Sequence, residues 1–220
     1  MSQIREQVDD AITVEGGADV EQAKQVLRNP RFLALFGSQI FTQVGGNMVL
    51  FGLTVTVFGV TGSSTAVSVL LLTFLVPAVV FGAIAGVFVD MFDRRQILVW
   101  SNFLRAGLYV LLLIFPDQLL VIYVVTALVA TLTTFFGPAE AAMIPVVVKR
   151  EQLLTANSFF VLMLQASFVI GFALLGPAAH RFLGMELLVI IVVAAYGAAG
   201  VLCWILPPAP PGQALEASFD

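Results

Sequence analysis

The chain has 220 residues, of which 60% are hydrophobic and only 11% are charged. Because a soluble globular protein carries about 25% charged residues, this chain has too little polar material to cover a surface that faces water. The composition therefore excludes a soluble domain and predicts a protein whose partner is the lipid bilayer. The net charge of −4 argues against a nucleic-acid partner.

A membrane-spanning helix needs about 20 mostly apolar residues, and six stretches of the chain meet that length. A polar N-terminal extension of residues 1–31 precedes them, and a proline-rich tail of residues 207–220 follows. We therefore predict an all-α integral membrane protein with a six-span domain over residues 32–206. In chain order, the spans are expected at residues 32–60, 65–89, 97–115, 118–137, 152–177 and 186–206.

Lysine and arginine residues in short loops set the orientation of a membrane protein. One side of the predicted topology holds Lys24, Arg28, Arg31, Arg94, Arg95, Lys149 and Arg150, whereas the other side holds only Arg181. This bias predicts a multi-pass protein of the cell (plasma or inner) membrane with both termini in the cytoplasm. The extension and the tail are then both cytosolic.

The second and fifth predicted spans match each other at an offset of 90 residues, with seven identities in a window of 22. A repeat unit with an odd number of spans must insert its second copy upside down. The match therefore favours six helices arranged as a 3+3 inverted repeat, which is one way to build half of a transporter.

Several polar side chains lie within the predicted spans, where they are costly unless they face protein or water. Gln39, Gln43 and Asn47 are spaced by four and share one face of the first span, and Gln165 lies in the fifth. Two interpretations stay open for them, namely hydrogen bonds between helices and the lining of a substrate cavity. We include all four residues in the candidate cavity.

Arg105 is the deepest positive charge, eight residues into the third span, or about 12 Å from its start. An arginine at that depth is costly unless it is solvated or paired. It either lines the cavity and meets an anionic group of a substrate, or extends toward the interface, or binds a carbonyl group of a broken helix. We include Arg105 in the candidate cavity.

The segment of residues 86–95 connects the second and third spans and carries a concentrated set of charges. Asp90 and Arg94 are four residues apart and can pair on a helical turn. Glu140 is predicted at the cytosolic end of the fourth span, level with this segment. We expect a cytosolic gate whose ion network includes these groups, although the arginines also fix the orientation. The gate residues are Gly86, Asp90, Asp93, Arg94, Arg95 and Glu140.

This segment resembles the loop between spans two and three of the major facilitator superfamily, whose pattern is a glycine, three residues, an aspartate, a basic residue, a glycine and a basic pair. Gly86, Asp90, Arg94 and Arg95 match it, whereas Met91 and Asp93 depart from it. The Asp-x-Phe-Asp-Arg-Arg form is similar to the drug- and siderophore-exporter branch, as are residues 136–145 and 149–158. The resemblance covers about residues 28–206.

The resemblance implies half of a major facilitator fold and secondary transport, with efflux of a small amphipathic molecule by alternating access. It also implies that the 86–95 segment latches the two halves of the transporter. Gly171 and the pair at residues 176–177 resemble part of a span-five motif of antiporters, which implies a coupling proton. We predict no acidic residue deep in any span to carry that proton.

We expect no enzymatic activity, no cofactor and no metal site, because the chain has one cysteine, Cys203, and one histidine, His180. The alternative function is a non-transporting membrane scaffold or assembly subunit. Since six spans form only half of such a transporter, we expect the chain to be a fragment, a split half or one protomer of a homodimer. Its expected partners are a small-molecule substrate and a second six-helix half.

Overall fold

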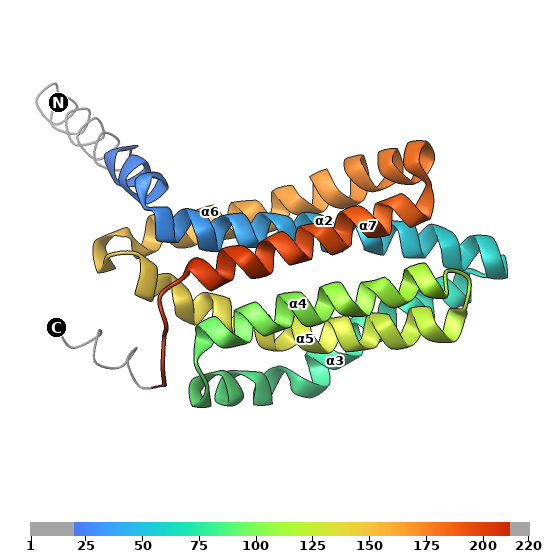
Figure 1. Ribbon diagram of the computed structural model, residues 1–220, viewed down its shortest axis with the longest axis horizontal. Coiled ribbons are helices and arrows are strands. Elements are labelled where there is room, and N and C mark those ends of the chain that lie inside the picture. The colour runs from blue at the N-terminus through green and yellow to red at the C-terminus, as the bar shows by residue number, and fades with distance from the viewer. Residues whose placement is uncertain (1–19, 212–220) are drawn as a thin grey trace, which may run out of the picture.

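The computed structural model describes residues 20–211, and every regular element in that range is helical. The predictions for residues 1–19 and for residues 212–220 lie outside the described residues. Residues 20–28 form a short helix that leads into the bundle (Figure 1). The helices that follow are α2 (Pro30–Thr61), α3 (Ser64–Met91), α4 (Arg94–Ile114), α5 (Leu119–Val147), α6 (Leu153–Ser167) and α7 (Gly176–Ile205). A 3-10 turn, η1 (Arg150–Gln152), precedes α6, and a π-helical stretch, η2 (Phe168–Leu175), joins α6 to α7.

The predicted all-α fold with six membrane spans is confirmed. Five helical stretches of the described residues are long and apolar enough to cross a membrane, and the last of them runs for 56 residues from Arg150 to Ile205. That stretch doubles back at Gly184, whose φ of 78° breaks the helix, as Figure 1 shows at the reversal between the orange and red segments. The fifth span is therefore α6, η2 and the start of α7, and the sixth span is the rest of α7.

The packing between helices confirms the 3+3 inverted repeat. An inversion exchanges spans one and four, two and five, and three and six. The first span α2 packs against α7, as the fourth span α5 packs against α4. The second span α3 packs on α5, just as the fifth span, formed by α6 and η2, packs on α2. The third and sixth spans, α4 and α7, pack against each other. Each extensive contact thus has its counterpart in the other triplet.

Local capping fixes several helix ends. Asn29 caps α2 because its side chain accepts hydrogen bonds from the backbone amides of Arg31 and Phe32 at 3.0 and 3.3 Å. Gly62 ends α2 in the left-handed conformation, with a φ of 63°. Asp93 caps α4 by accepting from the amide of Arg95 at 2.9 Å.

Two predicted boundaries are wrong. The fourth span does not end at Gly137, because α5 continues to Val147 through Pro138 and Pro145. Spanning helices tolerate proline when neighbouring groups satisfy the freed carbonyls. The predicted loop around His180 is also helical, and the chain reverses only at Gly184.

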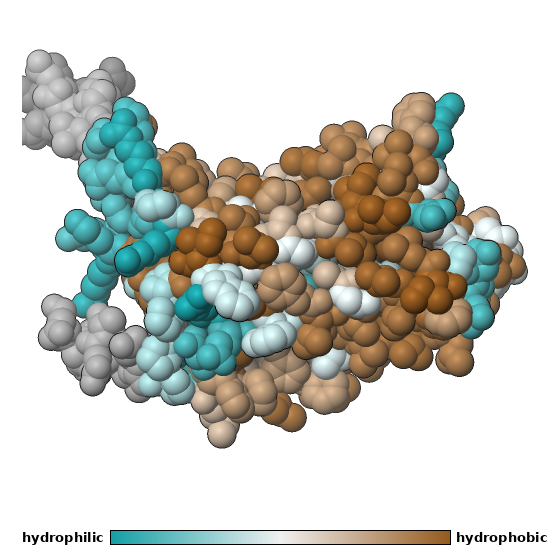
Figure 2. Space-filling model, viewed as in Figure 1, coloured by the Kyte–Doolittle hydropathy of each residue, from teal (hydrophilic) through white to brown (hydrophobic). Residues whose placement is uncertain are grey.

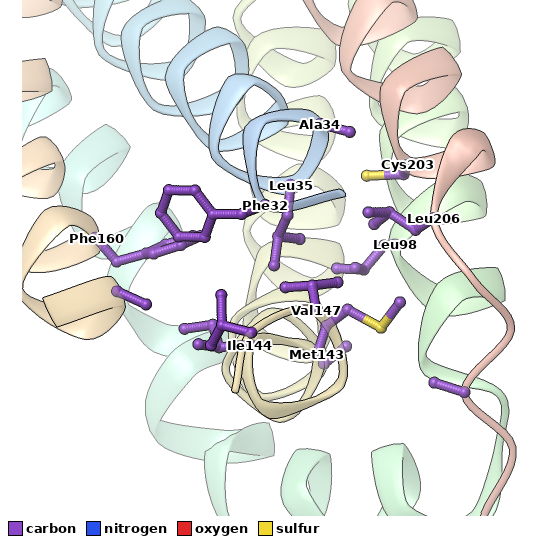
Figure 3. Packing of buried hydrophobic residues seen from close by; sticks show 14 of the residues in the cluster. Phe32, Ala34, Leu35, Leu98, Met143, Ile144, Val147, Phe160, Cys203 and Leu206 are labelled. Carbon is purple, nitrogen blue, oxygen red and sulfur yellow. The ribbon is translucent and has the colours of Figure 1, made fainter. Parts of the chain in front are cut away.

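Two buried clusters form the core, one toward each end of the bundle. In the first cluster, Phe32 and Leu35 of α2 point toward Ile144 and Val147 of α5, with Phe160 of α6 beside them (Figure 3). On the face that Figure 2 shows, hydrophobic side chains cover most of the middle, and hydrophilic ones gather near both ends. This distribution is the one that a bilayer-spanning bundle requires.

Candidate functional site

A cluster of buried polar side chains lies between α2, α4, α5 and α7, in a core that is otherwise apolar. We call this cluster the polar centre. Six side chains form it, and each is at most 7% exposed. They are Ser38, Gln39, Asn102, Arg105, Glu140 and Cys203.

Arg105 is 2% exposed and is held by neutral partners on every side. Its guanidinium donates to the Ser101 carbonyl at 3.0 Å, to Asn102 Oδ1 at 2.9 Å and to Thr133 Oγ1 at 3.4 Å. Its carbon Cζ lies 4.3 Å from the ring centroid of Phe136 and 5.0 Å from that of Tyr196, which is the geometry of a cation–π contact. The side chain therefore stays inside the bundle and does not extend to the interface.

Glu140 lies inside the bundle rather than at the end of its span, which corrects two predictions. It is seven residues before the end of α5, or about 10 Å, because the helix continues past Pro138. Its two carboxylate oxygens each lie 2.7 Å from the amide nitrogen of Gln39, when that amide is oriented to donate to them. An acidic residue is therefore buried in the spans, contrary to the expectation of none.

A second group of contacts joins the same helices nearer to α7. Ser38 Oγ lies 3.0 Å from Cys203 Sγ, and Asn102 Nδ2 donates to both, at 3.4 and 3.5 Å. Asn102 also accepts from Arg105, so it connects the arginine to the first and sixth spans. The polar centre thus links four helices through side chains.

A cavity of about 90 Å³ borders the polar centre. The polar part of its wall includes Gln43, Asn47 and Arg105, so the structure brings together three of the five predicted cavity residues. The other lining residues are Thr42, Gly46, Leu50, Phe74, Tyr109, Val129, Thr133, Phe136 and Tyr196. An apolar wall with a few polar groups is typical of a site for a small molecule.

The other two predicted cavity residues lie elsewhere. Gln39 is 1% exposed and contacts Glu140, so it supports the wall from behind. Gln165 is an exposed residue of α6 and does not line this cavity.

The 86–95 segment is held by charges and by the chain that follows α7. Arg94 is 3% exposed, and its Nη2 lies 3.5 Å from Asp90 Oδ1, so the predicted pair forms. Arg94 also donates to the Pro210 carbonyl at 3.3 Å, and its backbone amide donates to the Ala209 carbonyl at 3.2 Å. Among the described residues no ion pair joins this segment to Glu140, so the predicted network with Glu140 does not form here.

The remaining two charges of the segment also contact the C-terminal side of α7. Asp93 Oδ1 accepts from the Ala209 amide at 3.2 Å, and Arg95 donates to the Trp204 carbonyl. Gly86 is half-buried in α3, and a side chain added there would meet nothing within 4 Å. Close helix packing is found instead at Gly171 and Gly176.

Gly171 and Gly176 mark the closest crossing between the first and fifth spans. A Cβ atom on Gly171 would lie 2.6 Å from the Val44 carbonyl oxygen and 2.8 Å from Asn47 Cβ. One on Gly176 would lie 2.8 Å from Phe51 Cβ. Because Asn47 also lines the cavity, this crossing fixes one wall of the candidate site.

Comparisons with known proteins agree with this architecture. Residues 31–220 match the family model of the Major Facilitator Superfamily. The chain belongs to the Major Facilitator Superfamily.

Two curated members of the superfamily, both from Bacillus subtilis (strain 168), resemble the chain. It is 24% identical over 182 residues to the uncharacterized MFS-type transporter YkuC, and the aligned segment covers 80% of this chain and 42% of that protein. It is 26% identical over 186 residues to the uncharacterized MFS-type transporter YfiS, and the aligned segment covers 84% of this chain and 44% of that protein. The chain thus spans less than half the length of these relatives. No solved structure matches it significantly.

As a member of the Major Facilitator Superfamily, the chain is a multi-pass membrane protein of a transporter family, and its matches are to transporters and not to enzymes. The described residues hold no group of three or more metal-ligating side chains.

Sequence reasoning missed several residues of the site. Asn102 had a detectable signal, because it lies three residues before Arg105 and such pairs meet on a helix. Tyr109 lies four residues after Arg105 and so shares the same helical face. Tyr196 carried no such signal, because only the tertiary fold places the sixth span beside the third.

Proposed function

We propose that the protein acts as one half of a secondary transporter that exports a small amphipathic molecule by alternating access. The observation that carries this proposal is the polar centre beside a partly apolar cavity, inside a six-span bundle. Buried charges in spans are costly, and they mark substrate or ion pathways. The efflux direction follows from the resemblance of the 86–95 and 136–158 segments to exporters.

We propose that a second six-helix unit, either another chain or a second copy of this one, completes the transport path. The second span supports the proposal of such a partner, because only 11% of the most apolar 18 residues of α3 are buried within the chain. Large apolar side chains such as Val79, Ile84 and Val87 are 59–76% exposed along it. Lipid covers such a face as well, so oligomeric size in detergent decides whether two copies associate.

We further propose that the coupling ion is a proton and that Glu140 exchanges it. A carboxylate in the bundle with a neutral amide partner can take up a proton without breaking an ion pair. Arg105 shares the polar centre, and its charge interacts with Glu140 across it. Tyr109, Tyr196 and Cys203 are the other titratable groups whose charges act on Arg105 in the polar centre.

The 86–95 segment is proposed as the cytosolic gate, with both termini in the cytoplasm of the cell membrane. Asp90, Asp93, Arg94 and Arg95 would hold it closed, and Gly86 begins the segment. The Asp90–Arg94 pair at 3.5 Å and the contacts of Asp93 with Ala209 support this role, because each can break as the bundle tilts.

Flux into sealed proteoliposomes tests the proposal. The purified chain is reconstituted and offered a panel of amphipathic anions, cations and neutral compounds, with and without a pH gradient. We expect substrate-dependent flux that responds to the gradient, and a Glu140→Gln variant that retains flux down a substrate gradient but loses the response to pH. Absence of flux under every gradient, both from the chain alone and from the chain reconstituted together with its second six-helix half, would favour the membrane scaffold instead.

A further inference from the structure

We infer that the cavity beside Arg105 receives the acidic group of its substrate, so that the transported molecule is an amphipathic organic anion. This inference rests on the proposed function and narrows its substrate class. It depends on the free hydrogen-bond donors of Arg105, on the absence of a direct ion pair to this residue among residues 20–211, and on the walls of the cavity.

Some hydrogen-bond donors of the Arg105 guanidinium have no acceptor in the described part of the chain. A guanidinium carries five N–H groups, and the described contacts use three of them, on Nε, Nη1 and Nη2. One N–H is therefore left on each Nη nitrogen. Two parallel donors on the two Nη atoms match the two oxygens of a carboxylate.

The positive charge of Arg105 also has no direct counter-ion. Among residues 20–211, no carboxylate oxygen lies within 4.0 Å of it. Glu140 is the acidic side chain in the same centre, and Gln39 binds both of its oxygens at 2.7 Å. Arg105 and Glu140 therefore interact only through space, and a bound carboxylate would give the guanidinium the direct anionic acceptor that it lacks among these residues.

The aromatic contacts keep the guanidinium in place without satisfying its charge. The ring centroids of Phe136 and Tyr196 lie 4.3 and 5.0 Å from Cζ. Asn102 and Thr133 accept hydrogen bonds from Nη2 and Nη1 and so fix the orientation of the guanidinium plane. The fork is therefore rigid before a ligand arrives, and rigid donors lose less conformational entropy on binding.

The rest of the wall fits the body of an amphipathic acid. Phe74, Tyr109, Val129 and Leu50 supply aromatic and aliphatic surface, whereas Gln43 and Asn47 on the α2 side supply polar groups. A cation would be repelled by Arg105, and Glu140 is already bound by an amide. The cavity volume of about 90 Å³ calls for a small probe.

Benzoate and benzamide form a matched pair, because they share one shape and differ in charge. Their binding to the purified chain in nanodiscs is measured by calorimetry, at a pH where benzoate is ionised. We expect the wild-type protein to bind benzoate at least about tenfold more tightly than benzamide. Arg105→Gln removes this preference, and Arg105→Lys keeps only part of it because it lacks the fork. Arg181→Gln, at a cation that lies over Phe182, leaves the preference unchanged.

A second variant keeps the test informative if Arg105→Gln does not fold. Asn47→Asp is isosteric and adds a negative charge to the cavity wall, so it weakens benzoate binding more than benzamide binding. Equal wild-type affinities for the two probes, or a preference for benzoate that survives in a folded Arg105→Gln protein, would overturn the inference.

The two proposals fail in different ways. Binding that prefers benzoate, in a protein that moves no compound across vesicles even when it is reconstituted with its second six-helix half, overturns the transport function alone. Flux of cations or neutral amphiphiles without any preference for anions overturns the substrate class alone.

Discussion

Gly171→Ala tests how closely the fifth span crosses the first. The new methyl group would lie 2.6 Å from the Val44 carbonyl oxygen, about 0.8 Å closer than ordinary van der Waals contact, which begins at 3.4 Å. It would also lie 2.8 Å from Asn47 Cβ. Since neither atom is the flexible tip of a side chain, α2 itself must shift. Overpacking of a well-packed core costs about 1–3 kcal/mol, and contact with the backbone places this change in the upper half of that range.

Thermal unfolding in detergent measures the effect. A loss of about 2–3 kcal/mol corresponds to a fall in Tm of about 4–12 °C for a chain of this size. Two other glycine variants serve as graded controls. Gly82→Ala adds a methyl group with nothing within 4 Å, and Gly52→Ala meets the flexible Met185 sulfur at 2.8 Å. We expect Gly171→Ala to be least stable, then Gly52→Ala, and Gly82→Ala to match the wild type or exceed it. A Tm for Gly171→Ala equal to that of Gly82→Ala would refute the reasoning about the crossing.

Two capping residues give further predictions. Asn29→Ala removes the cap of α2 and the 2.6 Å hydrogen bond from Nδ2 to the Val147 carbonyl, so the free energy of unfolding falls by about 1–3 kcal/mol. Asn29→Ser keeps a capping oxygen and loses less. Equal Tm values for the two variants would contradict this account. Asp93→Ala removes both the cap of α4 and the acceptor for the Ala209 amide. We expect a loss of about 0.5–2 kcal/mol and faster hydrogen exchange at Ala209, whereas Asp93→Asn restores most of both; unchanged exchange in Asp93→Ala would show that this contact does not hold the chain after α7.

Much of the fold is determined by the sequence alone. Runs of about 20 apolar residues can satisfy their backbone groups in lipid only as helices, so the six spans follow from composition and length. Spacing along one helix is local as well, which is why the Asp90–Arg94 pair could be predicted. The depth of Arg105 within its span could also be predicted, because the helical rise converts residue number directly into distance.

Only the tertiary structure decided what the buried charges contact. Proline at position 138 reads as a helix end in an isolated sequence, yet α5 continues past it and carries Glu140 into the bundle beside Gln39. The partners of Arg105 on α5 and α7 are 28 or more residues away in sequence, and no local pattern encodes such a contact. Packing of spans one, three, four and six around one centre selects which polar side chains meet there, because each helix presents only one face to its neighbours.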